Sequence, residues 1–313
     1  MGKYDVPRTN KPAKSPWGPN DQKGRLNWIT AESCFEIINA IDPKKYYNLA
    51  VNYFVGMPSW KGAGDPSYQI WMTHTPQGNV NDDLMKGVTV DSKKLCSYSG
   101  DAFSMYTHTG THLDAFNHFG YFGEIWNGFN EKEDLGSRTW MKCGIEQFPP
   151  MIIARAVMLD IAAMKGVDCL PDSYVITVDD LKQCIKWENI ELKKGDIIMI
   201  RTGRMSLWPD CDKYEWNTPG IEIHGAEFLV GEGGMILASD NIALEVAPSV
   251  EPDNYFPVHS YLFSEVGASI LELLWLEDLS KEKIYEGGLI MMPLPLVGAT
   301  GAPTQPMFFP FKK

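Results

Sequence analysis

The stretch His108-Thr109-Gly110-Thr111-His112-Leu113-Asp114-Ala115-Phe116-Asn117-His118 holds three of the six histidines in this 313-residue chain. Imidazole nitrogens and carboxylate oxygens are the ligands that zinc- or manganese-like divalent ions take. Two histidines and one aspartate make a three-ligand set, which leaves a coordination position open for water. An open position is typical of catalytic rather than structural metal sites. The alternative interpretation is a surface turn that is rich in histidine.

The spacing of His108, His112 and Asp114 excludes a regular element. On a helix, Asp114 would lie about 200° around the axis from His112. On a strand, His108 and His112 would stand about 13 Å apart. We therefore predict a turn between the two histidines and an extended segment from His112 to Asp114. Gly110 permits such a turn, and Thr111 can fix it through a local hydrogen bond.

The pattern His-x-Gly-Thr-His-x-Asp-x-x-x-His resembles the signature of the metal-dependent cyclase family, which includes bacterial kynurenine formamidase and isatin hydrolase. The sequence departs from the family at Phe116, where proline is usual, which affects the local backbone and the pocket wall but no ligand. The likeness runs from about residue 45 to the C-terminus and rests also on four weaker stretches in the family's order: residues 195–203, 218–220, 239–241 and 293–296.

The resemblance implies a divalent metal cofactor, Zn or Mn, with one or two ions per chain. His108, His112 and Asp114 would hold the first ion. His259 and Glu272 would complete a second position, with Asp114 able to bridge the two.

The residues around Glu272 support this only in part. The apolar run 260–274 is typical of a helix, and a buried carboxylate is costly unless it is paired or bound to a cation. The alternatives are an exposed position for Glu272 on the polar stripe of that helix and a hydrogen-bonded loop position for His259.

His118 has a different expected role. The resemblance suggests a proton shuttle, which suits the one side chain whose ordinary pKa lies near neutrality. A ligand or ligand-supporting role is the competing interpretation. His74 and His224 have no partner pattern and are interpreted as structural. Asp240 and Glu245 could support the site, but we interpret both as surface charges.

The resemblance implies a metal-dependent hydrolase acting on a small amide, cyclic amide or lactone, because a bound ion lowers the pKa of water and polarises a carbonyl. The alternatives are a non-hydrolytic lyase or cyclase that uses the same site, and a binding protein that retains metal. The aromatic residues near the motif would suit a flat, aromatic substrate, although core packing could explain each one: Phe116, Phe119, Tyr121 and Trp126.

Composition excludes several other classes. The net charge of -12 argues against nucleic acid and anionic membranes as partners. No stretch approaches the roughly 18 apolar residues of a membrane span, and the N-terminus lacks the core of a signal peptide. Six scattered cysteines without a Cys-x-x-Cys pair favour a reduced, cytoplasmic setting. From the family we expect a homodimer or homotetramer.

We predict one α/β domain over residues 29–313, preceded by a Pro/Gly-rich arm, residues 1–28, that lies on the surface or on a neighbouring subunit. The resemblance adds a swivelling β/β/α architecture with a mixed sheet. Expected strands are 47–55, 69–73, 102–107, 151–160, 196–201, 235–238 and 288–292; expected helices are 30–41, 177–187 and 225–230. The glycine-rich residues 231–234 are interpreted as a helix stop rather than a phosphate loop.

Overall fold

A nine-stranded mixed sheet runs through the computed structural model, which describes residues 2–83 and 85–312. Its strand order is β1-β13-β11-β5-β7-β9-β10-β4-β12. Four central strands are parallel: β5 (Ile152–Asp160), β7 (Asp196–Arg201), β9 (Gly234–Ser239) and β10 (Ser269–Glu272). These strands are almost continuously apolar and buried, as expected when both faces of a parallel sheet are covered.

Antiparallel strands extend the sheet on both sides. On one side lie β11 (Glu286–Met291), β13 (Met307–Pro310) and β1 (Tyr47–Asn48). On the other lie β4 (His112–Asp114) and β12 (Gly301–Pro303). The predicted α/β class with a mixed sheet in a single domain is confirmed.

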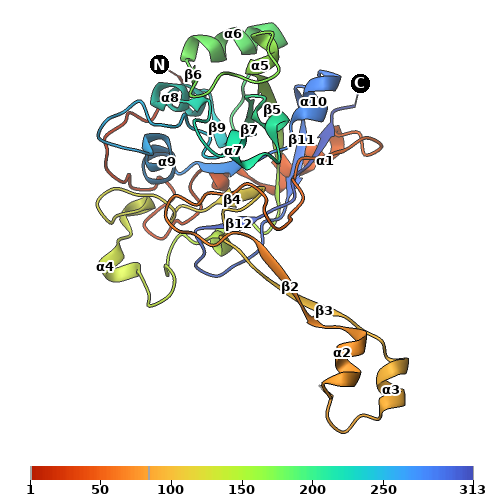
Figure 1. Ribbon diagram of the computed structural model, residues 1–313. Helices are drawn as coiled ribbons and strands as arrows, with labels where there is room; N and C mark the ends of the chain where they lie inside the picture. Colours follow the sequence, from red (N-terminus) through yellow and green to blue (C-terminus); the bar gives the residue numbers. More distant parts are fainter. Residues whose placement is uncertain (1, 84, 313) are drawn as a thin grey trace.

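Helices α5 (Ile161–Met164), α6 (Val178–Glu188) and α8 (Ile223–Gly231) pack on β5, β7 and β9, whereas α1 (Ala31–Ala40) packs across β5 and β11 (Figure 1). Thr30 and Thr177 cap α1 and α6 through their hydroxyl groups, as N-cap threonines do. The shorter elements are η1 (Gly24–Trp28), η2 (Trp126–Gly128), α4 (Glu131–Asp134), η3 (Ile145–Gln147), η4 (Arg204–Leu207), α7 (Cys211–Tyr214), α10 (Glu277–Glu282), and the paired strands β6 (Val175–Ile176) and β8 (Gly220–Ile221).

The N-terminal arm lies against its own chain. The amide of Tyr4 donates to the carbonyl of Gly231 at 3.0 Å, and that of Ala13 to the carbonyl of Ser264 at 2.8 Å. Arg25 is buried, and its guanidinium donates to the carbonyls of residues 230 and 234. We expected the arm on the surface or on a neighbouring subunit. Of these two positions, the contacts support the surface of its own chain.

The predicted helix over residues 260–274 is wrong. The segment forms a short α9 (Pro257–Tyr261), one π-helical turn, η5 (Leu262–Val266), and then β10. Gly267, at φ +66°, makes the reversal between turn and strand. An apolar run without polar interruptions does not distinguish a buried helix from a buried parallel strand. The expected strand 47–55 is also wrong beyond β1.

We call residues 66–83 and 85–106 the hairpin extension; its two strands and the two helices at its tip stand away from the body (Figure 1). Strands β2 (Gln69–His74) and β3 (Gly100–Ser104) form a two-stranded sheet of their own. Two short helices at the tip, α2 (Pro76–Asn81) and α3 (Val90–Leu95), pack on each other. Within residues 2–83 and 85–312, the helices are too short or too polar to cross a membrane.

Asp240 holds the loop that follows β7. It is fully buried, and its carboxylate accepts hydrogen bonds from the amide and hydroxyl of Thr202 and from the amide of Gly203, at 2.7–2.9 Å. Burial raises the pKa of Asp240 to about 6 in spite of these donors. The interpretation of Asp240 as a surface charge is therefore wrong. Its buried carboxylate satisfies the backbone amides of Thr202 and Gly203.

Gly203 allows a test of this loop. Its φ is +79°, and a Cβ there would lie 2.0 Å from the carbonyl oxygen of Asp168. Gly203→Ala is expected to lower the free energy of unfolding by about 3 kcal/mol or more, from the left-handed backbone and the clash together. Gly166→Ala is the matched control, because φ there is +72° but a Cβ would meet nothing within 4 Å. Its expected loss is only about 1 kcal/mol. Equal losses in urea denaturation would contradict this account.

Candidate metal centre

Strand register brings two distant parts of the chain together at the carboxyl end of β10. In the antiparallel pair of β4 and β10, His112 lies directly opposite Glu272, so their side chains share one face. Asp114 is two residues further along β4 and therefore lies on that face as well. The Nε2 atom of His112 is 3.2 Å from Oδ1 of Asp114 and 3.6 Å from Oε2 of Glu272.

The predicted turn before β4 is confirmed. Gly110 has φ +64°, and its carbonyl accepts a hydrogen bond from Nδ1 of His112 at 2.8 Å. Because a carbonyl can only accept, Nδ1 carries the proton and Nε2 faces the carboxylates. We expected Thr111 to fix the turn through a local hydrogen bond, and this expectation is wrong. Its hydroxyl donates to the carbonyl of Leu273 and accepts from the amide of Val51, which ties the motif to two other segments.

His108 approaches Asp114 from the loop side. Its Nδ1 lies 2.6 Å from Oδ1 of Asp114, and its Nε2 lies 2.8 Å from the hydroxyl of Thr300. Gly301 sits opposite Asp114 in the neighbouring strand β12. A Cβ at Gly301 would come within 2.7 Å of the His108 ring, so only glycine leaves room for this imidazole.

Glu245 orients His259 from behind. Its Oε1 accepts from Nδ1 of His259 at 2.6 Å and from the His259 amide at 3.0 Å, while Oε2 accepts from the amide of Val258. The Nε2 atom of His259 then faces the site, 3.3 Å from Oε1 of Glu272 and 3.9 Å from Oδ2 of Asp114. The interpretation of Glu245 as a surface charge is wrong. The sequence contained a sign of this role, because a lone carboxylate inside the apolar run 242–246 needs hydrogen-bond partners if it is buried.

His118 lies beside the other imidazoles of the site. Its ring stacks on that of His108, with 3.8 Å between centroids, and lies 6.2 Å from that of His259. Burial and the neighbouring His108 hold the pKa of His118 well below its usual value. His118 is therefore neutral at pH 7 and able to accept a proton.

The site combines buried carboxylates with imidazoles that compensate for them. Burial opposes ionisation of Asp114, but His108 and His112 outweigh it and hold its pKa well below the usual range. Burial lowers the pKa of His259, but its contacts with Glu245 and Glu272 outweigh this effect and raise it to about 10. The buried carboxylates Asp114 and Glu272 thus each have an imidazole beside them.

Several buried polar atoms converge without a hydrogen-bond partner among the described residues. They are Nε2 of His112, Oδ2 of Asp114 and Oε1 of Glu272. Two sets offer ligand atoms within 4.8 Å of one another and share Asp114: His108, Asp114 and His118, and Asp114, His259 and Glu272. Such orphaned nitrogen and oxygen donors suit a divalent metal ion.

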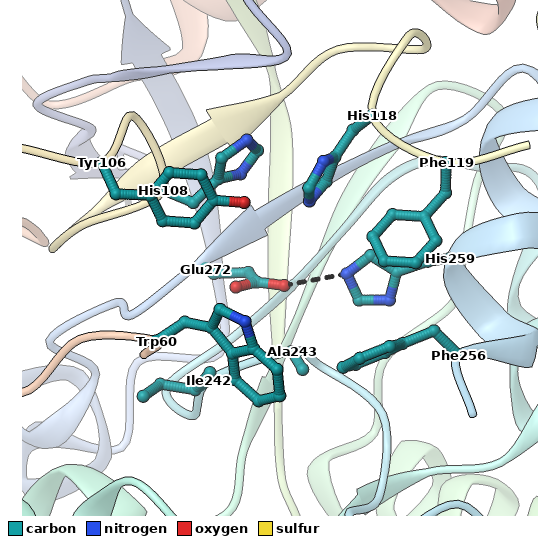
Figure 2. A pocket seen from close by; sticks show the side chains of 10 residues that line it. All are labelled: Trp60, Tyr106, His108, His118, Phe119, Ile242, Ala243, Phe256, His259 and Glu272. Atoms are coloured by element: carbon teal, nitrogen blue, oxygen red, sulfur yellow. Dashed lines mark ion pairs between the residues drawn. The ribbon is translucent and has the colours of Figure 1, made fainter. Parts of the chain in front are cut away.

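An aromatic pocket opens above these groups (Figure 2). Its cavity volume is about 70 Å³, and it is partly open to solvent. It is lined by Trp60, Tyr106, His108, His118, Phe119, Ile242, Ala243, Phe256, His259 and Glu272. Figure 2 shows the Tyr106 hydroxyl pointing into the hollow. Burial, together with nearby carboxylates, raises the pKa of Tyr106, so it stays a hydrogen-bond donor.

Only one of the four aromatic residues proposed near the motif lines this pocket. Phe119 does so, whereas Phe116 and Trp126 are buried in the core and pack on each other. The Tyr121 hydroxyl donates to Glu265 instead. The rest of the aromatic wall comes from Trp60, Tyr106 and Phe256, none of which was predicted from the sequence. His74 and His224 lie outside the pocket, on the hairpin extension and on α8.

Residues 47–246 match the model of the Cyclase family. The chain belongs to the cyclase family. A crystal structure described as a novel cyclase is 28% identical, with 96% of this chain and 99% of that chain covered and a TM-score of 0.81. Isatin hydrolase A from Ralstonia solanacearum is 18% identical, with 84% and 91% covered and a TM-score of 0.59. An isatin hydrolase bound to the product analogue thioisatinate is 17% identical, with 91% and 100% covered and a TM-score of 0.59. The two isatin hydrolases share the fold of this cyclase-family chain. A search of the curated proteins finds no match.

The substitution Glu245→Gln, studied in chelator-treated protein, tests whether Glu245 holds His259 in place. An amide cannot accept all three donors, so we expect a loss of about 1–3 kcal/mol in the free energy of unfolding. The pKa of His259 should fall from about 10 toward its ordinary value in an NMR titration. Because the folded pKa is raised, its contribution to stability is complete below about pH 6.5 and is lost as pH rises through 10. The variant should lose that pH dependence.

Glu227→Gln is the matched control, because Glu227 pairs with the exposed His224 on the surface. Its removal should change stability by no more than about 1 kcal/mol. The account of Glu245 fails if both substitutions have the same small effect.

Proposed function

We propose that this chain is a metal-dependent hydrolase that opens a small amide, cyclic amide or lactone with metal-activated water. The observation that carries the proposal is the convergence of orphaned donors from His112, Asp114 and Glu272 beneath an aromatic pocket. Two proteins with the same fold are isatin hydrolases, one of them bound to a product analogue. Isatin is itself an aromatic cyclic amide.

We assign the metal to zinc or manganese, with one or two ions per chain. His108, His112 and Asp114 would hold the first ion, and His259 and Glu272 the second, with Asp114 shared between them. The second set of ligand atoms, Asp114, His259 and Glu272, supports the second position, and the presence of Asp114 in both sets supports its sharing. The first set contains His118 rather than His112; His112 enters this proposal through its unpartnered Nε2, 3.2 Å from Asp114. A bound ion of this kind lowers the pKa of water toward 7 and polarises a carbonyl oxygen.

The remaining groups bind substrate and move protons. Neutral His118 can take a proton at its ring nitrogen from the attacking water and return it to the leaving nitrogen or oxygen. The Tyr106 hydroxyl, which has no hydrogen-bond partner among the described residues, can donate to a substrate oxygen. Trp60, Phe119 and Phe256 would exclude water and contact the faces of a flat ring.

His112→Ala is expected to abolish metal binding and hydrolysis together while leaving the fold largely intact. Metal per chain is measured by elemental mass spectrometry, and turnover on isatin, an aryl formamide and an aromatic lactone. His224→Ala, which removes an exposed histidine, should change neither. A fully active, metal-free His112→Ala protein would refute the proposal.

The same measurements on the unmodified protein decide two further questions. About two metal equivalents would support the shared position of Asp114, whereas one would leave His259 and Glu272 as pocket residues. Gain of one water in the product mass distinguishes hydrolysis from the alternative, a lyase or cyclase reaction at the same site.

His118→Ala is expected to keep its metal but lose about 100-fold or more in turnover, the usual contribution of a positioned acid or base. The metal content and the pH profile of turnover are measured together. Loss of metal in this variant would make His118 a ligand and move the proton role elsewhere.

A further inference from the structure

The aromatic pocket is too small for the flat substrates proposed for it. Its cavity volume is about 70 Å³, whereas pockets that enclose small molecules usually measure about 300–1,000 Å³. Part of the wall must therefore move when a substrate enters. The candidate ligands and His118 are held by the contacts described above, which leaves the aromatic residues as the movable part.

Trp60 differs from the other aromatic wall residues in its backbone. Tyr106, Phe119 and Phe256 each accept a hydrogen bond at their own carbonyl. Trp60 lies on the loop between β1 and β2, and its amide and carbonyl make no hydrogen bond with residues 2–83 or 85–312. Segments with few backbone hydrogen bonds open most easily. We call residues 58–64 the tryptophan loop.

One carboxylate holds the tryptophan loop on both sides of Trp60. Glu215 is only 8% exposed, and its Oε1 accepts from the amide of Ser59 at 3.1 Å and from Nζ of Lys61 at 2.9 Å. Glu215 comes directly after α7, and its own amide donates to the carbonyl of Cys211 at 3.0 Å. We call the two contacts of Glu215 with the loop the Glu215 clamp. They tie the loop to the body through a side chain rather than through a backbone ladder.

Ring contacts place the Trp60 indole against the same part of the body. Trp216, the neighbour of Glu215, lies 6.1 Å from Trp60 between ring centroids, and Phe256 lies 5.8 Å away. A Cβ at Gly62 would come within 2.6 Å of the indole, so glycine leaves the ring its room. Figure 2 shows Trp60 on the opposite side of the pocket from His118. A flat ring bound between them would contact the indole.

The Glu215 clamp can open while the body stays folded. The side chain of Lys61 is 42% exposed, and ion pairs at exposed positions contribute little to stability. Loops that open and close over a ligand are drawn from such weakly held segments. The clamp therefore favours the closed position of Trp60 without locking it.

We propose that Trp60 is a specificity-determining residue whose movement admits flat ring substrates, and that Glu215 is the positioning residue that returns it to the pocket wall. The returned indole limits the size of the ring system that binds. This inference rests on the proposed function, because the substrate is the same small aromatic amide or lactone.

The first test follows Trp60 without any reaction. The full-length protein is labelled with 5-fluorotryptophan, and the Trp60 resonance is assigned by its absence in Trp60→Phe. Indole is the probe, because it is flat, uncharged and has no carbonyl to hydrolyse. Indole should shift the Trp60 resonance. Glu215→Ala should weaken indole binding on the order of tenfold, because the ligand must then order the tryptophan loop itself.

Two variants separate positioning from stability. Glu215→Gln keeps an oxygen that can accept from the loop, so it should bind indole nearly as the unmodified protein does. Asp180→Ala removes a carboxylate of similar burial that also accepts from a backbone amide, that of Thr177, and from a lysine, Lys165. It should leave the Trp60 resonance and the indole affinity unchanged. A Trp60 resonance that indole does not move, or equal affinities in Glu215→Ala and Asp180→Ala, would overturn the proposal.

The second test measures turnover of N-phenylformamide and N-(2-naphthyl)formamide, which differ by one ring. Glu215→Ala should raise KM for both and leave kcat unchanged, because it removes binding shared by the ground and transition states. Trp60→Ala should raise the ratio of kcat/KM for the naphthyl over the phenyl substrate on the order of tenfold, since the wall that limits ring size is gone.

The outcomes distinguish this inference from the hydrolase proposal. An unchanged ratio in Trp60→Ala would overturn the role of Trp60 in specificity, and an unchanged KM in Glu215→Ala would overturn the positioning role of Glu215. If indole binding responds to Glu215→Ala but the protein hydrolyses neither these formamides nor isatin, the moving wall stands and the hydrolase proposal alone fails.

Discussion

The buried carboxylate of Asp114 is the group on which the site depends. Its three neighbours His108, His112 and His259 come from a loop, from its own strand and from a helix more than 140 residues away. A buried carboxylate without compensating charge is far too costly to keep. The fold therefore needs these imidazoles, or a cation, at this point. The pairing of β4 with β10 is the backbone arrangement that provides them.

Backbone conformation at the site shows what this arrangement costs. Ala243 and Leu244, which precede Glu245, have φ values of +80° and +56°, and Leu273, which follows Glu272, has +56°. Left-handed backbone at such residues costs about 1–2 kcal/mol each and persists only where the surroundings hold it in place. Here the surroundings are buried hydrogen bonds, such as that from Thr111 to the carbonyl of Leu273. The conformation directs two carboxylates inward rather than stabilising the core.

The sequence alone predicted the parts of the site that lie close together in the chain. The turn at Gly110 and the extended segment to Asp114 follow from spacing and stereochemistry, and three of the four parallel strands, β5, β7 and β9, follow from their apolar runs. The assignment failed where one pattern serves two structures. The run 260–274 reads equally well as helix or strand, so Glu272 was placed on the wrong element. Glu245 was misjudged because its partner lies on another segment, and spacing carries no information about that contact.

The aromatic pocket was missed for a related reason, and the reason links the site to the hairpin extension. Trp60 and Tyr106, which line the pocket, flank the base of the extension, where the amide of Tyr106 donates to the carbonyl of Pro66. Their positions depend on how a 41-residue excursion begins and ends, which local sequence does not specify. The stacking of Tyr68 on Phe103 and its contact with Tyr53 hold this base together. A contact that fixes the base of the extension therefore also restricts the pocket wall.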